Sequence, residues 1–193
     1  MAKYTLNIGQ ELHSDTLIYR IESVLGQGSF GITYKAKAFT VIKGKFGEEL
    51  VETNTPKAIK EFFMKEVNER EESGSITRMS EGGLTYNYAQ KFKKEAENLA
   101  SMNHPNIVKV IDFISANNTC YYVMDFIEGE NLNDYLKNKD SDWLKLLSQR
   151  CMKRGLAPQK IFLKRPTGSN WQIVISKNRN SNNNCLRKLW FQN

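Results

Sequence analysis

Three glycines, one lysine and one glutamate in the first half of the sequence have the types and spacing needed to bind phosphate. The glycines fall in the run Leu25-Gly26-Gln27-Gly28-Ser29-Phe30-Gly31. Glycine lets backbone amides approach an anion without obstruction by a side chain. Lys60 lies in Ala58-Ile59-Lys60 and can direct a positive charge at a phosphate.

The hydrophobic pattern around these residues predicts the elements that position them. After Gly31, apolar and polar residues alternate in Ile32-Thr33-Tyr34-Lys35-Ala36, which predicts a strand and therefore a glycine loop inside a hairpin. A helix expected from Tyr86 to Met102 places Glu95 on an otherwise apolar face. A carboxylate in that position needs a partner, and Lys60 is the natural candidate.

The remaining pattern predicts a sheet of short strands with two long insertions. Strands are expected at Leu17–Leu25, Gly31–Phe39, Pro56–Phe63, Ile107–Ile114 and Cys120–Ile127, with a turn at Asn117-Asn118. A loop is expected at Lys43–Asn54 and an exposed insertion at Lys65–Thr85. Short helical stretches are expected at Leu132–Asn138 and Trp143–Met152.

Residues Tyr19 to Leu136 resemble the N-terminal lobe of a protein kinase of the bacterial (Hanks-type) serine/threonine class. The resemblance rests on the glycine loop, Lys60, Glu95, the run His104-Pro105-Asn106-Ile107-Val108 and the hinge-like run Tyr122-Val123-Met124-Asp125-Phe126-Ile127-Glu128-Gly129. It implies an α+β fold in which an antiparallel sheet of about five strands packs against one main helix. An incomplete helical part is expected to follow.

The resemblance also implies an ATP site. Met124 would be the gatekeeper, the backbone of Asp125 and Ile127 would face adenine, and Asn131 would lie near the ribose. Thr33 and Lys57 stand where the family usually has valine. The implied ATP-binding residues are Leu25, Gly26, Gln27, Gly28, Ser29, Phe30, Gly31, Thr33, Ala58, Lys60, Glu95, Met124, Asp125 and Ile127.

The carboxylates that such an enzyme uses later in its chain are not found in this sequence. Residues 143–193 contain 11 Lys and Arg but no Asp or Glu, so they carry +11, whereas residues 1–142 carry −4. The catalytic loop would fall near residues 165–175, where the sequence reads Arg165-Pro166-Thr167-Gly168-Ser169-Asn170-Trp171. We therefore expect no catalytic Asp and no metal ligands here, although the family uses Mg²⁺.

These features lead to two functional hypotheses. By resemblance, the chain is an ATP-binding serine/threonine protein kinase, a transferase that as written is catalytically incomplete. The alternative is a non-catalytic nucleotide-binding pseudokinase or regulatory module.

The expected domains are an N-terminal extension (1–16), the kinase N-lobe with its hinge (17–140) and a basic, acid-free segment (141–193). That last segment has three interpretations: an out-of-frame coding sequence, a short pseudokinase lobe or a nucleic-acid-binding tail.

The rest of the composition restricts location and partners. The three cysteines, Cys120, Cys151 and Cys185, form no C-x-x-C motif, which suits a reducing cytoplasm. The sequence shows no secretory signal and no apolar run of membrane-spanning length. A cytoplasmic location is therefore expected. The protein substrate is unidentified, nucleic acid is not the expected partner, and self-association through an uncovered lobe surface is expected.

Overall fold

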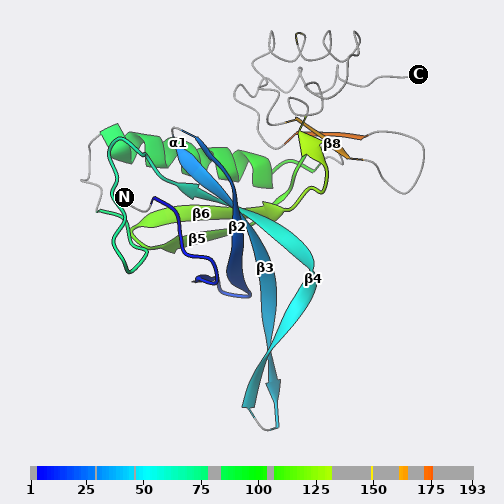
Figure 1. The fold of residues 1–193 in the computed structure, drawn as a ribbon. Helices are drawn as coiled ribbons and strands as arrows, with labels where there is room; N and C mark the ends of the chain where they lie inside the picture. The colour runs from blue at the N-terminus through cyan, green and yellow to red at the C-terminus, as the bar shows by residue number, and fades with distance from the viewer. Residues whose placement is uncertain are drawn as a thin grey trace. The chain divides into compact units, whose positions relative to one another are not determined.

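The computed structural model describes residues 4–28, 30–45, 47–77, 84–103, 107–131, 149, 161–164 and 172–175. The chain divides into two compact units, one formed by residues 1–103 and 109–126 and the other by residues 104–108 and 127–193. The first unit contains the strands β1 (Glu11–His13), β2 (Ile18–Gly28), β3 (Gly31–Gly44), β4 (Gly47–Phe62), β5 (Val110–Ala116) and β6 (Thr119–Asp125), together with the helix α1 (Leu84–Ala100) (Figure 1).

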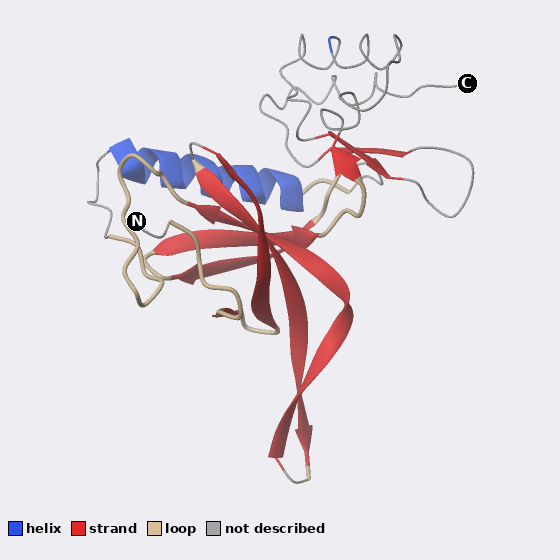
Figure 2. Ribbon diagram, viewed as in Figure 1, coloured by secondary structure: helices blue, strands red, loops and turns tan. Residues whose placement is uncertain are grey.

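The first unit is built on an antiparallel sheet with one helix across it. The strand order is β1-β2-β3-β4-β6-β5, so the sheet has six strands where about five were expected. The additional strand is β1, which lies in the segment expected to be an N-terminal extension and pairs with β2 through Leu12↔Tyr19. Figure 2 shows α1 lying across one face of this sheet. The predicted kinase-like α+β fold is therefore confirmed.

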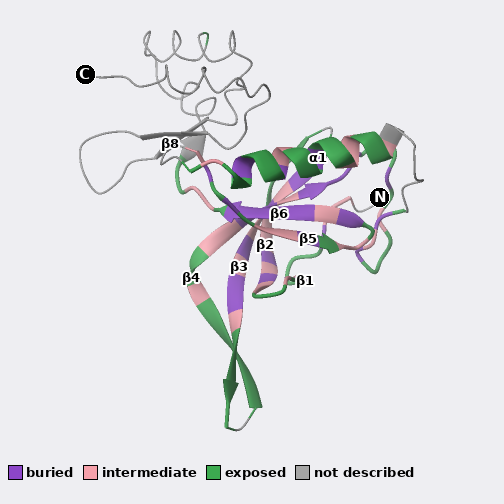
Figure 3. Ribbon diagram, turned by 180° about the vertical axis from the view of Figure 1, so that it is seen from behind, coloured by how far each residue is buried: buried purple, intermediate pink, exposed green. Residues whose placement is uncertain are grey.

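The β3–β4 hairpin is much longer than the sequence predicted. The expected loop at Lys43–Asn54 is wrong, because the two strands stay paired out to Gly44↔Gly47. Cross-strand ion pairs support the extension, with Lys37 Nζ 3.0 Å from Glu52 Oε1 and Lys43 Nζ 3.4 Å from Glu48 Oε1. Figure 3 shows that the outer part of this ribbon is exposed. Both faces of this outer part are in contact with solvent, so its sequence lacks the alternation of apolar and polar residues that is typical of a half-buried strand.

The sheet buries apolar side chains on both faces. One face carries the larger core, which includes Tyr19, Ile21, Ile32, Tyr34, Ile59, Tyr121 and Val123. The other face packs against the helix residues Phe92, Ala96 and Leu99, all of them buried as the periodicity predicted. The Phe92 ring lies 5.6 Å from the ring of Phe62 in β4. Burying side chains as large as those of Phe92 and Leu99 contributes roughly 1.5–3 kcal/mol each, so α1 is held firmly on the sheet.

The segment after β4 was predicted to be an exposed insertion, and most of its described residues are exposed, but a few of them are buried against the sheet. In its described part, Asn68 is 3% exposed and Ile76 is fully buried. The Asn68 side chain accepts a hydrogen bond from the backbone N–H of Met64 at 2.9 Å, which turns the chain back onto the sheet. The predicted turn at Asn117 and Asn118 is confirmed, since both residues have positive φ, 53° and 58°.

The second unit contains an antiparallel three-stranded sheet with the order β7-β8-β9. The strands are β7 (Glu130–Asn131), β8 (Ile161–Lys164) and β9 (Gln172–Ile175). No strands were predicted at residues 161–164 and 172–175, which form β8 and β9 and pair through Phe162↔Val174. The expected helices at Leu132–Asn138 and Trp143–Met152 lie outside the described residues, apart from Gln149, which is helical. In the described part of the chain, no helix is long and apolar enough to cross a membrane.

Candidate functional site

The strand register brings the predicted phosphate-binding residues into one row across the sheet. Gly26 of β2 pairs with Thr33 of β3, and Thr33 pairs with Lys60 of β4. Lys60 in turn pairs with Tyr122 of β6. Directly opposed residues of antiparallel strands project from the same face. Gly26, Thr33, Lys60 and Tyr122 therefore share the face that α1 covers.

Lys60 and Glu95 form the ion pair on which the site depends. The Lys60 Nζ lies 3.1 Å from the Glu95 Oε1, and the two side chains are 17% and 18% exposed. The ammonium group also lies 5.3 Å from the centre of the Phe92 ring and 5.2 Å from that of Tyr122. A cation between two aromatic faces is favoured electrostatically. The lysine is thus fixed at the end of its aliphatic chain by a carboxylate and two rings.

Tyr122 completes this pair, and the sequence analysis did not assign it a role. Its hydroxyl accepts a hydrogen bond from Lys60 Nζ at 3.0 Å and donates one to Glu95 Oε1 at 3.0 Å. Burial raises the pKa of Tyr122 well above its usual value, with the charge of Glu95 and the hydrogen bond to it adding to the effect. The proton therefore stays on the hydroxyl. Strand alternation from Met124 could have placed Tyr122 on this face.

The glycine loop is the connection between β2 and β3. Gly28 pairs with Gly31, so the paired ends of the two strands are only three positions apart in the sequence. A strand follows Gly31, as the predicted hairpin requires, and Ser29 lies outside the described residues. The Phe30 ring stacks on Tyr88 of α1 with the ring centres 4.7 Å apart. The loop is therefore in contact with the helix that carries Glu95.

The other predicted ATP-site residues fall into three groups. Ala58 pairs directly with Met124, and both are buried on the face that carries Lys60. The Asp125 carboxylate is bound by Lys57 Nζ at 2.8 Å, while Ile127 belongs to the second unit. The strand that leads into the loop ends in exposed positions, which are Leu25, Gly26, Gln27 and Gly28.

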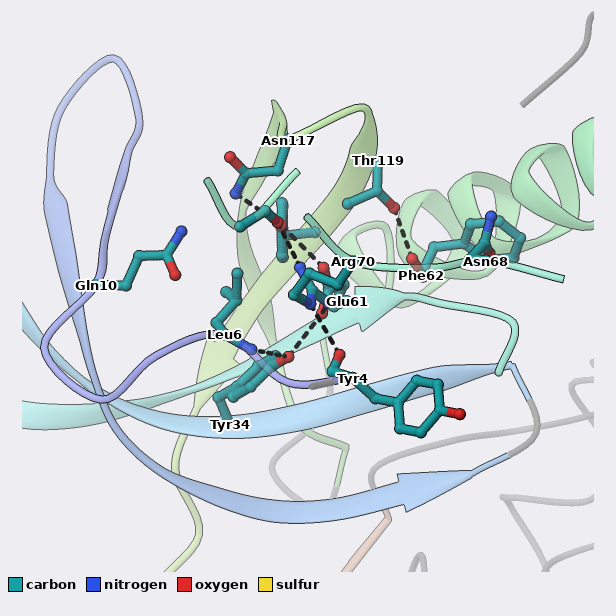
Figure 4. A network of polar contacts seen from close by, with 12 residues as sticks. Tyr4, Leu6, Gln10, Tyr34, Glu61, Phe62, Asn68, Arg70, Asn117 and Thr119 are labelled. Atoms are coloured by element: carbon teal, nitrogen blue, oxygen red, sulfur yellow. Dashed lines mark hydrogen bonds and ion pairs between the residues drawn. The ribbon is translucent and has the colours of Figure 1, made fainter. Parts of the chain in front are cut away.

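A second ion pair, which the sequence analysis missed, lies on the opposite face of β4 (Figure 4). Arg70 Nη2 lies 2.7 Å from Glu61 Oε2, and the two side chains are 2% and 0% exposed. Tyr34 donates to Glu61 Oε2 at 2.7 Å and Tyr121 donates to Glu61 Oε1 at 3.0 Å. The signal was present in the alternation, because the strand that points Lys60 to one face must point Glu61 to the other.

Arg70 also binds the segments that fold back over this face. Its Nε donates to the backbone oxygen of Tyr4 at 2.8 Å and its Nη1 to that of Gly74 at 2.6 Å. Burial alone would lower the pKa of Arg70, but the charge of Glu61 and its hydrogen bond outweigh burial and raise that pKa above its usual value. Arg70 therefore remains charged. This network joins the start of the chain and the 65–77 segment to the sheet.

The described residues do not offer a ligand set for a metal ion. Among them, no three His, Cys, Asp or Glu side chains cluster closely enough to hold one. Magnesium prefers several oxygen ligands, usually carboxylates with phosphate and water. Lys60 contributes a positive charge, and its neighbour Glu95 is engaged by that charge.

Comparison with known proteins places this geometry in a family. The chain is 40% identical over 50 residues to a probable serine/threonine-protein kinase, CPE1738, of Clostridium perfringens, an alignment that covers 26% of this chain and 7% of the relative. It is 25% identical over 130 residues to the probable serine/threonine-protein kinase YbdM of Bacillus subtilis, which covers 67% of this chain and 40% of the relative. The chain therefore spans less than half the length of these relatives.

A solved structure and a family model extend the comparison. The structure titled PpkA-294 apo form superposes with a TM-score of 0.62 at 21% identity, covering 91% of this chain and 62% of that one. At that identity the likeness concerns the fold. The model of the protein kinase domain matches residues 19–154, which is most of the chain and includes Lys60, Glu95 and Tyr122. The chain therefore belongs to the protein kinase domain family.

Proposed function

We propose that this chain binds ATP, with the phosphates beneath the Gly26–Gly31 hairpin and against Lys60. The observation that carries the proposal is the contact of 3.1 Å between Lys60 Nζ and Glu95 Oε1, made on the sheet face that also bears Gly26. In this family such a lysine pairs with the α- and β-phosphates, and the helix glutamate orients it. Ala58 and Met124, paired and buried beside Lys60, are proposed to line the adenine end.

The glycines of the loop support this proposal because the fold explains only one of them. A Cβ atom at Gly31 would lie 2.6 Å from the backbone oxygen of Glu61, so packing of the sheet demands glycine there. A Cβ at Gly26 would meet nothing within 4 Å, and one at Gly28 would meet only the Gly31 oxygen at 3.9 Å. Neither of these two glycines has a positive φ. Their missing side chains leave open space, which is what an approaching phosphate requires.

Phosphoryl transfer to a serine or threonine hydroxyl is the activity that the names of the relatives imply. It needs a carboxylate that positions the hydroxyl and further ligands that hold Mg²⁺. From Trp143 to Asn193 the sequence contains neither Asp nor Glu. We therefore propose that these 193 residues hold the nucleotide without transferring its γ-phosphoryl group, in the manner of a regulatory nucleotide-binding module.

Calorimetric titration of the full chain with ATP, with and without Mg²⁺, tests this function. The wild type is expected to bind in both conditions, and Lys60→Met is expected to bind at least about tenfold more weakly, since a charge-assisted contact is worth roughly 1.5–3 kcal/mol. Lys37→Met is the matched control, because Lys37 lies in a surface ion pair with Glu52 on the same sheet. A wild type without affinity for ATP, or a Lys60→Met variant with unchanged affinity, contradicts the proposal.

A further inference from the structure

Two consecutive tyrosines of β6 perform parallel tasks on opposite faces of the sheet. Tyr121 is paired in register with Glu61, and Tyr122 with Lys60. Each hydroxyl donates at 3.0 Å to a glutamate that belongs to an ion pair, Tyr121 to Glu61 and Tyr122 to Glu95. Both tyrosine side chains are buried. The two residues therefore differ in the ion pair they serve and not in chemistry or burial.

Around Tyr122 the three polar groups close a ring of hydrogen bonds. Lys60 Nζ donates to Glu95 Oε1 at 3.1 Å and to the Tyr122 hydroxyl at 3.0 Å, and that hydroxyl donates to the same Glu95 oxygen at 3.0 Å. The hydroxyl uses its proton and one of its lone pairs in this ring. Glu95 Oε1 consequently has two tethers to the sheet, one from the ammonium group and one from the phenol.

The phenol tether does not depend on the lysine. Tyr122 is fixed by its backbone pairing in β6 and by the Phe92 ring, whose centre lies 4.9 Å from its own. The lysine, by contrast, reaches the site through a flexible chain of methylene groups. When the ammonium group turns to meet a phosphate, the phenol still holds the carboxylate. The pKa of Tyr122, raised by burial, keeps the donating proton in place across the neutral range.

We propose that Tyr122 is a positioning residue that holds Glu95, and with it helix α1, on the sheet independently of Lys60. Its consequence for nucleotide binding rests on the function proposed above. In this arrangement the helix is in place before any nucleotide arrives, and Lys60 meets a carboxylate that is already oriented. If the lysine alone oriented the carboxylate, Glu95 and the part of α1 around it would lose that anchor whenever the lysine was replaced.

Hydrogen–deuterium exchange of the nucleotide-free chain tests the tether. We expect Tyr122→Phe to raise exchange in the half of α1 that contains Phe92, Ala96 and Leu99 by about tenfold, as loss of a hydrogen bond to a charged group implies. Lys60→Met is expected to change that exchange by less than about threefold. In the double variant, exchange in α1 is expected to rise by more than the product of the two single increases. The reason is that in each single variant the remaining tether partly compensates for the lost one.

Tyr121→Phe is the matched control, since it removes one buried hydroxyl from the same strand on the other face. It is expected to lower the stability of the whole unit without a selective effect on α1 or on ATP affinity. Tyr122→Phe is expected to weaken ATP binding about fivefold or more in protein that remains folded. Equal effects of the two substitutions, or Lys60→Met exchange as fast as that of the double variant, would overturn the proposal.

A second pair of variants covers the case in which Tyr122→Phe does not fold. Glu95→Gln keeps an oxygen that can accept from the Tyr122 hydroxyl, whereas Glu95→Met keeps none. Exchange in α1 is expected to stay within about threefold of wild type for Glu95→Gln and to rise about tenfold for Glu95→Met. Equal exchange in both overturns the tether. The exchange arms need no nucleotide, so a wild type that fails to bind ATP contradicts the proposed function and leaves this test intact.

Discussion

Lys60 and Glu61 are consecutive residues of β4 whose opposite charges are neutralised on opposite faces of the sheet. Lys60 is bound to Glu95 at 3.1 Å on the face of α1, and Glu61 to Arg70 at 2.7 Å on the face of the larger core. The first pair is partly exposed and the second fully buried, so only the first is open to a ligand. One face of β4 thus carries the candidate ligand-binding residue, and the other carries a residue that stabilises the fold. Substitutions on the first face should affect ligand binding, and substitutions on the second should affect stability.

Replacement of Arg70 by Met is expected to destabilise the fold by about 3–5 kcal/mol, because it leaves Glu61 as an unpaired buried charge. Urea unfolding followed by circular dichroism or tyrosine fluorescence measures the change, since the three tryptophans all lie in residues 143–193 and do not report on the first unit. Arg20→Met is the control, since Arg20 pairs with Glu11 at 2.8 Å near the surface. Its expected cost is about 0–1 kcal/mol. An Arg70→Met variant as stable as Arg20→Met would show that the buried pair does not stabilise the unit.

Alanine at Gly31 and at Gly26 is expected to separate packing from ligand binding. Gly31→Ala places a Cβ 2.6 Å from the Glu61 backbone oxygen and should cost about 1–3 kcal/mol of stability. Gly26→Ala meets open space and should leave stability unchanged or raise it slightly, since alanine restricts the unfolded chain. The same Gly26→Ala variant should bind ATP more weakly. Thermal unfolding and ATP titration of both variants provide the comparison, and equal stability losses contradict it.

The elements around the candidate site were predictable from the sequence because each has a local signal. The alternation after Gly31 predicted the strand, and the apolar stripe of the helix predicted that Glu95 would need a partner. The buried role of Arg70 has no such local signal. Its partner Glu61 is nine residues away, but the tyrosines that complete the network come from β3 and β6, 27 and 60 residues from Glu61. Contacts of that kind are fixed by the topology of the sheet. From the sequence alone, a polar segment that makes such contacts cannot be distinguished from an exposed loop.

The outer part of the β3–β4 ribbon was predicted to be a loop, and that prediction was wrong for a different reason. Its outer part carries charges and glycines, which are typical of loops, and Gly47 adopts a φ of +132° at the turn. The pairs Lys43–Glu48 and Lys37–Glu52 bring these charges together across the two strands. Such pairing is invisible until the register is known. The helices predicted at Leu132–Asn138 and Trp143–Met152 fall outside the described residues, apart from Gln149, which is helical, so they stay predictions.

Alkaline pH is expected to destabilise the first unit from about pH 9 upward. Burial raises the pKa of the Cys120 thiol from 9.0 to about 12, so the unfolded chain loses this proton first. The stability that this group contributes is complete below pH 9 and is lost as pH rises toward 12. Burial also raises the pKa of Tyr34 and Tyr121 above the usual 10.0, which adds to the loss above pH 10.

Urea unfolding at pH 8, 9 and 10 measures this dependence. A single group of this kind changes the free energy of unfolding by at most about 1.4 kcal/mol per pH unit. Cys120→Ala is expected to flatten the decline between pH 9 and pH 10, whatever its effect on stability at pH 8. A wild type whose free energy of unfolding is constant from pH 8 to pH 10 would show that the thiol titrates alike in both states.

Incubation of the chain with radiolabelled ATP, Mg²⁺ and a general protein substrate is expected to give no transfer of label. The reason is chemical: residues 143–193 contain no carboxylate that could position a hydroxyl or hold the metal, so charge that develops on the γ-phosphoryl group has little to balance it. Lys60→Ala is the necessary control, because a contaminating kinase would label the substrate equally in both samples. Label that appears with the wild type and disappears with Lys60→Ala would show that the chain transfers phosphate, and that a carboxylate before Trp143 takes the part assigned to the catalytic loop.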